Sequence, residues 1–246
     1  MRVEIWSDVA CPWCYIGKAR FEQGLAGFEH KDEVEVVFRS FELDPRIPEG
    51  ETGPVLGMLA KKYGMSEAQA RQAEERVASN ARSEGLEYRT DGRDNGNTFA
   101  IHRLLHFAKT KGAQNELINL TFKANFAEER SVFDRDRLLE LAVTAGLDED
   151  EARGVLNDPE AYAAEVRQDE REAQELGATG VPFFVLDRRY GVSGGQPAEV
   201  FKQALEEAWR SRPQPTKLPS VPGLGSDEIG QSGEVCGPDG CAVPQR

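Results

Sequence analysis

Two cysteines lie three residues apart in the stretch SDVACPWCYIGKARF, which spans residues 7–21. Cys11 stands at the start of a predicted helix, where unpaired backbone N–H groups and the helix dipole favour a thiolate. Cys14 follows one turn later on the same face, within reach of a mixed disulfide formed on Cys11. Pro12 suits the first helical turn because its missing N–H costs nothing there. The pattern predicts dithiol–disulfide exchange, with Cys11 as the exposed attacking thiol and Cys14 as the more buried resolving thiol.

Three other roles for this pair fit the sequence less well. A zinc site needs more ligands, and no second C-x-x-C or Cys/His pair lies nearby at finger-like spacing. A disulfide across three residues closes a very small loop and would stabilise the fold little. Two ordinary core cysteines would not explain a position where a strand gives way to a helix. We therefore expect a redox-active centre at Cys11 and Cys14.

A second pair, Cys236 and Cys241, brackets the sequence Gly-Pro-Asp-Gly near the C-terminus. Residues 212–246 are rich in proline and glycine, which predicts a flexible tail. A linker of about 25 residues reaches about 25–30 Å, beyond the radius of gyration of about 18 Å expected for the folded body. We hypothesise that the tail pair exchanges electrons with Cys11 and Cys14. A closed surface disulfide, a metal-binding turn and no role are the alternatives.

Other polar residues carry weaker signals. His102 and His106 are four residues apart in a predicted helix, but without an H-E-x-x-H pattern or a third ligand we expect a packed or polar helix face and no metal site. Asp8 stands three residues before Cys11, where it is a candidate for proton transfer or for capping the helix. The segment GVSGGQP, residues 191–197, lacks a Walker lysine and predicts a backbone turn close to the site.

The elements that must position the cysteines begin with a β-α-β unit. Residues 2–6 and 33–43 predict strands by their alternation and β-branched content, and residues 17–28 between them predict a helix. A loop over residues 46–54 follows, and helical periodicity then runs almost unbroken to about residue 176. Ser66 with Gln69 predicts a capping box, Asp134 predicts another helix start, and residues 159–177 predict a further helix; these are the clearest boundaries in the block.

After the helical block the pattern returns to strands. Residues 183–186 and 190–192 predict a hairpin, and residues 197–211 predict a final amphipathic helix. This order indicates a mixed sheet, formed by residues 1–45 and 178–211, that is interrupted by an α-helical insertion over residues 46–177.

The composition is that of an ordinary folded protein, with 246 residues, 39% hydrophobic and 30% charged. The net charge of −13 repels phosphate groups, so we expect neither nucleic acid nor an anionic membrane as a partner. The sequence contains no apolar run of about 18 residues, so it predicts no membrane span. The sequence MRVEIW begins a strand and lacks the pattern of a secretory signal, so we expect a cytoplasmic protein. In that reducing compartment, catalytic, redox-sensing or metal-binding cysteines are more common than structural disulfides.

Pro182 in the segment TGVPFFV, residues 179–185, stands at the start of a predicted strand. A cis peptide bond would turn the Val181 backbone toward the active site, whereas an ordinary edge-strand proline would carry no such role. The sequence leaves both interpretations open.

Three motifs in order, SDVACPWCYIGKARF, GVPFFV and GVSGGQP, resemble the FrnE-type proteins of the DsbA-like branch of the thioredoxin superfamily. The resemblance covers about residues 1–211 and implies an α/β thioredoxin-like fold with a large α-helical insertion. It implies thiol chemistry at the C-P-W-C motif beside a cis Val181–Pro182 bond that aligns the substrate. It also implies that the helix over residues 97–107 faces the site, which would give His102 an accessory role. The family name connects it with polyketide biosynthesis.

One position departs from the family pattern. Periplasmic members carry histidine where this chain has Trp13, and tryptophan offers no charge to stabilise a neighbouring thiolate. We therefore expect a more reducing centre than in strong oxidants. Pro12, Trp13, Val181 and Pro182 are the residues expected to position the substrate.

We predict a cytosolic thiol–disulfide oxidoreductase or protein disulfide isomerase that acts on a disulfide-containing protein or small molecule. It would need no bound cofactor, only an external thiol donor such as glutathione or a thioredoxin-like partner. The alternative enzyme is a glutathione-dependent small-molecule isomerase or a polyketide-biosynthesis enzyme on the same scaffold. The similar 2-hydroxychromene-2-carboxylate isomerases typically carry serine at the position of Cys11, so the intact motif favours redox chemistry. The alternative of another class is a chaperone or binding protein whose cysteines only sense the redox state.

Overall fold

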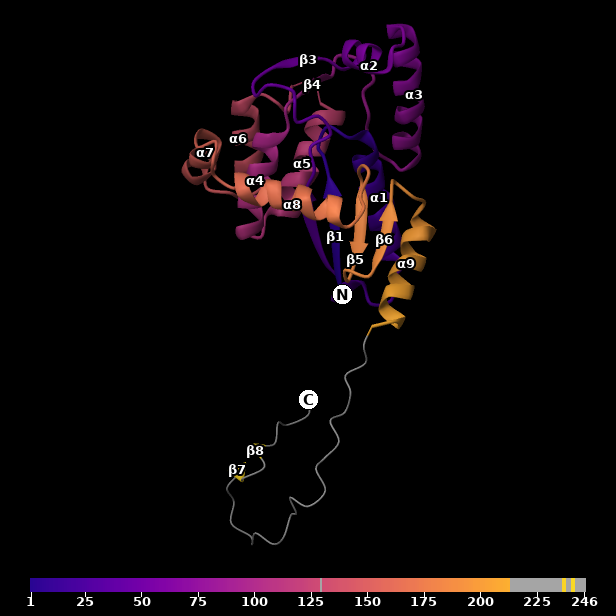
Figure 1. The fold of residues 1–246 in the computed structure, drawn as a ribbon, viewed down its shortest axis with the longest axis vertical. Helices are drawn as coiled ribbons and strands as arrows, with labels where there is room; N and C mark the ends of the chain where they lie inside the picture. Colours follow the sequence, from indigo (N-terminus) through magenta and orange to yellow (C-terminus); the bar gives the residue numbers. More distant parts are fainter. Residues whose placement is uncertain (129, 213–235, 238–239, 242–246) are drawn as a thin grey trace. The chain divides into compact units, whose positions relative to one another are not determined.

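The computed structural model of the chain describes residues 1–128, 130–212, 236–237 and 240–241 (Figure 1). Met1–Arg212 form one compact unit. In the second unit, Pro213–Arg246, the strands β7 (Cys236–Gly237) and β8 (Gly240–Cys241) pair antiparallel, and the backbone of Cys236 lies opposite that of Cys241. The rest of the predicted flexible tail after Arg212 lies outside the described residues.

A four-stranded mixed sheet with the order β2-β1-β5-β6 forms the centre of the first unit. The strand β1 (Arg2–Ser7) runs parallel to β2 (Glu35–Ser40) and antiparallel to β5 (Phe183–Leu186), and β5 pairs antiparallel with β6 (Tyr190–Ser193). The predicted strands are confirmed, but β2 is shorter than residues 33–43. It shortens because Lys31–Glu33 form a 3-10 helix and because β1, its only partner in the described sheet, ends opposite Ser40.

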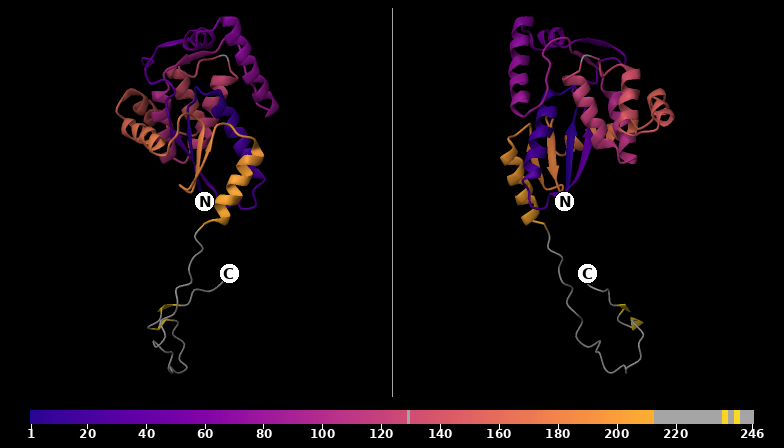
Figure 2. Two further views of the ribbon diagram at one scale, coloured as in Figure 1. Left: turned by 45° about the vertical axis from the view of Figure 1, so that its right-hand side comes forward. Right: turned by 180° about the vertical axis from the view of Figure 1, so that it is seen from behind.

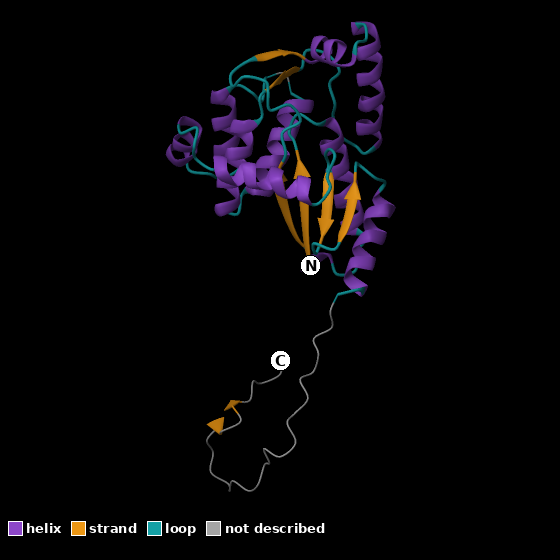
Figure 3. Ribbon diagram, viewed as in Figure 1, coloured by secondary structure: helices purple, strands orange, loops and turns teal. Residues whose placement is uncertain are grey.

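Helices cover both faces of this sheet (Figure 3). On one face lie α1 (Pro12–Ala26) and α9 (Ala198–Arg210), which run side by side (Figure 2). Phe184 of β5 packs there, with ring centroids 5.4 Å from Phe21 of α1 and 4.5 Å from Phe201 of α9. On the other face, Trp6 of β1 donates from Nε1 to the carbonyl of Asp169 in α8 (Ala163–Glu175) at 2.7 Å. Both faces of β1 are therefore buried, which holds the strand that leads into the cysteine pair.

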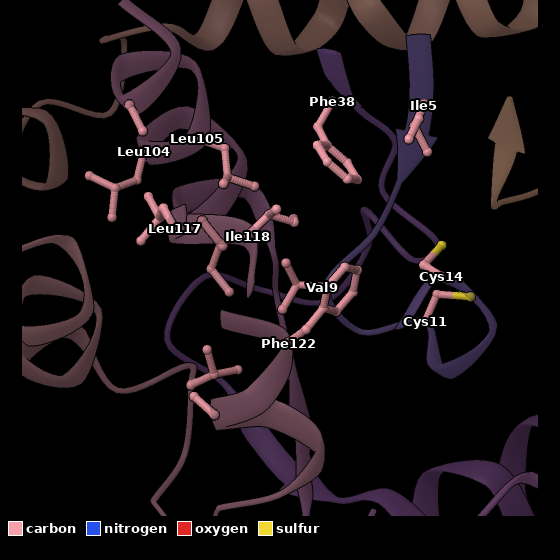
Figure 4. Close-up of a cluster of buried hydrophobic side chains, with 14 of the residues drawn as sticks. Ile5, Val9, Cys11, Cys14, Phe38, Leu104, Leu105, Leu117, Ile118 and Phe122 are labelled. Carbon is pink, nitrogen blue, oxygen red and sulfur yellow. The ribbon is translucent and has the colours of Figure 1, made fainter. Parts of the chain in front are cut away.

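The remaining helices come from the predicted insertion. They are α2 (Val55–Tyr63), α3 (Glu67–Ser83), α4 (Phe99–Thr110), α5 (Gln114–Phe126), α6 (Arg135–Thr144) and α7 (Glu149–Asn157). The capping box of Ser66 and Gln69 and the cap at Asp134 are confirmed. The α4–α5 pair shares one core with the sheet, because Leu105 and Ile118 belong to the same buried cluster as Ile5 and Phe38 (Figure 4).

Two details of the predicted insertion are wrong. The helix expected over residues 159–177 begins only at Ala163, because Tyr162 at its N-cap has a left-handed backbone with φ 60°. The loop predicted over residues 46–54 ends in a short strand, β3 (Thr52–Pro54), and the helical block is interrupted by β4 (Asp94–Gly96), with which β3 pairs antiparallel. These strands and α2 and α3 lie beyond the end of the sheet at which β1 finishes, the end that carries the cysteines (Figure 1).

Candidate active site

The two cysteines lie at the junction between β1 and α1, as predicted. Cys11 is the N-cap of α1 with extended backbone angles, and Pro12 opens the first turn. Cys11 and Cys14 are both free thiols and lie close together (Figure 4). Cys11 is 5% exposed and Cys14 is 2% exposed. The expectation of an exposed Cys11 is therefore wrong: its thiol contacts the Val181 carbonyl, and the residue lies in the lining of a cavity.

The environment of Cys14 keeps its sulfur protonated. Burial raises the pKa of the Cys14 thiol well above its ordinary value, and the hydrogen bond and charge of the neighbouring Cys11 raise it further. The Ser7 hydroxyl and the backbone N–H of Asp8 oppose this shift but do not offset it. A thiol that stays protonated until its surroundings change is suited to act second in an exchange reaction.

The Val181–Pro182 peptide bond is cis, which confirms the interpretation that the resemblance favoured. The Cys11 thiol donates to the Val181 carbonyl at a sulfur–oxygen distance of 3.6 Å. Phe183 begins β5 directly after the cis bond, so the sheet fixes the position of this carbonyl. Backbone polar groups are thereby presented beside the reactive sulfur.

The segment GVSGGQP turns close to the site, as expected. Gly195 lies against α1, and a Cβ added to Gly17 would come within 3.1 Å of the Gly195 Cα and 3.0 Å of Pro182 Cγ. Arg20 fixes the same turn by donating to the Gly195 carbonyl at 2.7 Å. The glycines thus allow the backbone of α1, the cis-proline and the turn to approach one another.

Asp8 is buried under the cysteine pair and organises the turn that precedes it. Its Oδ1 accepts from the Ala10 N–H at 3.1 Å, and its Oδ2 accepts from the Leu43 N–H at 2.7 Å. The helix α1 has no side-chain cap, so the suggestion that Asp8 caps it is wrong. Asp8 Oδ1 lies 3.6 Å from Nε2 of His102, which is also buried. The structure therefore brings His102 of α4 to the site through Asp8.

The charge state of His102 follows from this contact. Burial alone lowers the pKa of His102, but the nearby carboxylate of Asp8, with the charges of Glu42 and Glu170, outweighs burial and raises the pKa above its ordinary value. His106 points elsewhere, because its Nε2 lies 3.0 Å from Oδ2 of Asp169. The two histidines serve different carboxylates, and the described part of the chain holds no group of three or more His, Cys, Asp or Glu residues arranged for a metal ion.

Asn125 is a site residue that the sequence did not reveal. It lies near the end of α5, is buried, and donates from Nδ2 to the carbonyl of Val9 at 2.8 Å. This bond ties α5 to the turn just before Cys11. No motif marks Asn125, because its contact depends on how α5 crosses the end of the sheet.

A cavity of about 480 Å³ opens beside Cys11. The cysteine turn with Pro12 and Trp13 forms one wall, and α2, α3 and β4 supply the others. Arg93 lies in this lining, where its Nη2 is paired with the carboxylate of Glu74 and bonded to the Tyr88 hydroxyl. A sulfur nucleophile beside a second thiol, a fixed carbonyl and an adjacent cavity can carry out thiol–disulfide exchange on a bound substrate.

Comparisons with known proteins agree with this geometry. The sequence profile of the DSBA-like thioredoxin domain matches residues 2–206. The crystal structure of a probable DsbA oxidoreductase from Streptomyces coelicolor is 59% identical, covers 100% of both chains and has a TM-score of 0.85. The YwbO protein of Bacillus subtilis (strain 168) is 27% identical over 213 residues, which are 86% of this chain and 99% of the relative.

A more distant structure shares the fold. The cytosolic disulfide reductase DsbM from Pseudomonas aeruginosa is 20% identical over 85% of this chain and 99% of its own, with a TM-score of 0.61, and it is also known with GSH. Within the described ranges, no helix is long and apolar enough to cross a membrane.

Proposed function

The chain belongs to the family of DSBA-like thioredoxin domains, and from this premise we propose that it is a dithiol–disulfide oxidoreductase with Cys11 and Cys14 as its redox-active centre. The observation that carries the proposal is the placement of Cys11, which stands at the N-cap of α1 with its sulfur 3.6 Å from the Val181 carbonyl. We assign substrate positioning to Val181 and Pro182 at the cis peptide bond, and to Pro12 and Trp13, which line the cavity with Cys11.

The exchange proceeds in two displacements. The Cys11 thiolate attacks one sulfur of the substrate disulfide, so that a mixed disulfide forms on Cys11 and the first substrate thiolate leaves. Cys14 then loses its proton and attacks the Cys11 sulfur, which releases the second thiolate and forms the Cys11–Cys14 disulfide. Two electrons pass from the protein to the substrate, and two equivalents of an external thiol such as glutathione restore the dithiol. In the opposite direction the same steps oxidise a dithiol substrate.

We place this activity in the cytosol with a thiol donor and no bound cofactor. A reducing compartment keeps such a dithiol ready to react, and a reductase of the same fold works in the cytosol of Pseudomonas aeruginosa and binds GSH. A thioredoxin-like protein would serve as donor equally well in chemical terms.

The direct test is reduction of 2-hydroxyethyl disulfide with glutathione as donor. We expect turnover by the wild type, loss of turnover in Cys11→Ala, and a mixed disulfide on Cys11 that accumulates in Cys14→Ser and is visible by intact-mass spectrometry. Ser232→Ala, outside both cysteine pairs, is the matched control. Turnover by Cys11→Ala equal to that of the wild type would contradict the proposal.

The same variants separate the rival functions. A glutathione-dependent isomerase of small molecules would keep its activity in Cys14→Ser, because it needs no resolving thiol. A chaperone with redox-sensing cysteines would suppress aggregation equally well with Cys11→Ala. Protein disulfide isomerisation uses the same two thiols, and Cys11-dependent reactivation of scrambled ribonuclease is the assay that identifies it.

We further propose that Cys236 and Cys241 relay electrons between the external thiol donor and the Cys11–Cys14 pair. The support is the pairing of β7 with β8, which places the two cysteine backbones opposite each other as a disulfide requires.

A further inference from the structure

Large hydrophobic side chains gather at the mouth of the cavity beside Cys11. Trp13, Leu43 and Tyr63 line this cavity, and all three are among the six large hydrophobic residues that are most exposed in the described chain, at 39%, 40% and 62%. Exposed apolar residues that cluster around one opening mark a binding surface, whereas scattered ones need no explanation. The opening therefore suits a ligand with an apolar part.

The interior of the cavity continues this apolar surface. In α2, Val55, Met58 and Leu59 line the cavity, while Lys61 on the same helix is exposed. The helix packs on α3, β3 and β4, so its apolar side forms a wall of the cavity. Ile47 and Val77 extend the same lining.

The charges of the lining disfavour an anion. The carboxylates of Asp8, Asp44, Glu74 and Asp94 outnumber the cations of Lys62 and Arg93. Arg93 is paired with Glu74, and Nζ of Lys62 lies 3.9 Å from Oδ2 of Asp44. A ligand with carboxylate groups would add negative charge to a lining that has no uncommitted cation among these residues.

The position of Cys11 limits the size of the substrate. Cys11 lines the cavity and is only 5% exposed, so a substrate reaches its sulfur through the cavity. A disulfide held in the surface of a folded protein would approach this sulfur less readily than a small molecule, because the approach lies through the cavity that Cys11 lines. A small molecule that enters a cavity of about 480 Å³ can do so.

We propose that this cavity binds an uncharged disulfide of low molecular weight that carries an apolar group, and that Met58 and Leu59 determine this specificity. The inference rests on the proposed function, because it names the substrate class of the same site. Cys11 attacks the sulfur that bears the apolar group and forms a mixed disulfide with it while the other half leaves as a thiolate. Cys14 then displaces the apolar thiolate, and two equivalents of glutathione return the two electrons and are oxidised to glutathione disulfide.

Binding is tested without redox chemistry. The probe is the thioether in which a methylene replaces one sulfur of benzyl 2-hydroxyethyl disulfide, and calorimetry on the full chain measures its affinity. We expect Leu59→Lys to weaken binding more than tenfold. Leu56→Lys, the matched control on the same helix, is expected to bind as the wild type does because Leu56 lines a different hollow beside β3. Equal weakening by both variants, or by neither, would overturn the assigned cavity.

Substrate class is tested by turnover. With glutathione as donor, we expect kcat/KM for benzyl 2-hydroxyethyl disulfide to exceed that for its carboxylate analogue more than tenfold, and Leu59→Lys to remove this preference. Equal rates for the two disulfides would overturn the proposal. So would Cys11-dependent reactivation of scrambled ribonuclease that Leu59→Lys leaves unchanged, which would identify protein substrates.

The two levels of the proposal fail differently. If the redox function is wrong, the thioether still binds but the wild type reduces no disulfide. If only the substrate class is wrong, the wild type reduces 2-hydroxyethyl disulfide but binds the thioether no better than Leu59→Lys does.

Discussion

Asp8 and His102 form a buried pair directly behind the cysteine turn, and each depends on the other. Asp8 fixes the backbone at Ala10 and Leu43, and His102 lies 3.6 Å from its carboxylate. The nearby carboxylate of Asp8 favours the charged form of the buried His102 imidazole. The pair therefore places a titratable group close to the cysteine turn.

We predict that Asp8→Asn lowers the pKa of His102, because burial is then opposed mainly by the charges of Glu42 and Glu170. Nitrogen-detected NMR titration of the His102 ring measures this change. Asp44→Asn, which removes another carboxylate of the cavity lining, from the loop after β2, should leave the His102 titration as it is in the wild type. An unchanged titration in Asp8→Asn would contradict the pairing.

The same shift predicts how stability depends on pH. The folded protein binds the His102 proton more tightly than the unfolded chain does, because its pKa is raised on folding. The stabilisation is therefore complete below the unfolded pKa of about 6.5 and is lost as the pH rises through the higher folded value. Denaturant unfolding of the wild type and His102→Gln across this range should show a difference that decreases as the pH rises.

Asn125 gives a prediction on stability at the same scale. Asn125→Ala removes the donor to the buried Val9 carbonyl, so we expect the free energy of unfolding to fall by about 1–2 kcal/mol. Asn115→Ala, at an exposed position of the same helix, should change it by less than about 0.5 kcal/mol. Urea denaturation provides both values, and equal losses would contradict a specific role for Asn125.

At the scale of elements, the contact between α1 and α9 is close enough to require a glycine. A Cβ added to Gly24 would lie 2.6 Å from the Ala198 carbonyl oxygen and 3.0 Å from the Phe201 Cβ. Gly154 in α7 has nothing within 4 Å of the same position. The same substitution therefore meets opposite conditions in two helices.

We predict that Gly24→Ala destabilises the protein by about 1–3 kcal/mol, because the backbone of α9 has to move. Gly154→Ala should stabilise it by about 0.5–1 kcal/mol through the higher helix propensity of alanine. Thermal unfolding followed by circular dichroism measures both. A stabilising Gly24→Ala would mean that α1 and α9 pack less closely than the structure indicates.

The sequence predicted elements well where the periodicity was long and poorly where structure depended on distant partners. The strands β1 and β5 and the last amphipathic helix are where they were expected. The strands β3 and β4 have three residues each, too few for an alternating pattern, and exist only because they pair with each other. The start of α8 was misplaced because the pattern of residues 159–177 does not reveal the left-handed backbone at Tyr162.

The residues of the candidate site also fall into those that the sequence predicted and those that it did not. Cys11, Cys14 and Pro12 could be found because they belong to one local motif, whereas the cis bond at Pro182 was implied only by the family resemblance. The burial of Cys11, the bond from Asn125 and the cavity wall formed by α2 could not. They depend on how helices from the middle of the chain pack over the cysteine turn.

At the scale of the whole chain, the relay proposed for Cys236 and Cys241 has a direct test. We predict that Cys236→Ser with Cys241→Ser slows the reduction of the oxidised Cys11–Cys14 pair by glutathione several-fold, because the donor then lacks its intermediate. Stopped-flow tryptophan fluorescence measures this half-reaction, and the attack of the reduced pair on substrate serves as a control that should not change. Equal rates in the wild type and the double variant would contradict the relay.

The order of the strands has a consequence for synthesis of the protein. Val3 in β1 pairs with Leu186 in β5, so the middle of the sheet joins residues from opposite ends of the compact unit. A ribosome therefore releases the cysteine motif long before the strand that completes the sheet beside it. Contacts of such high sequence separation form slowly, and the nascent chain carries two uncovered thiols throughout that interval. Any oxidation of Cys11 and Cys14 during that interval would therefore precede the packing that buries them in the finished fold.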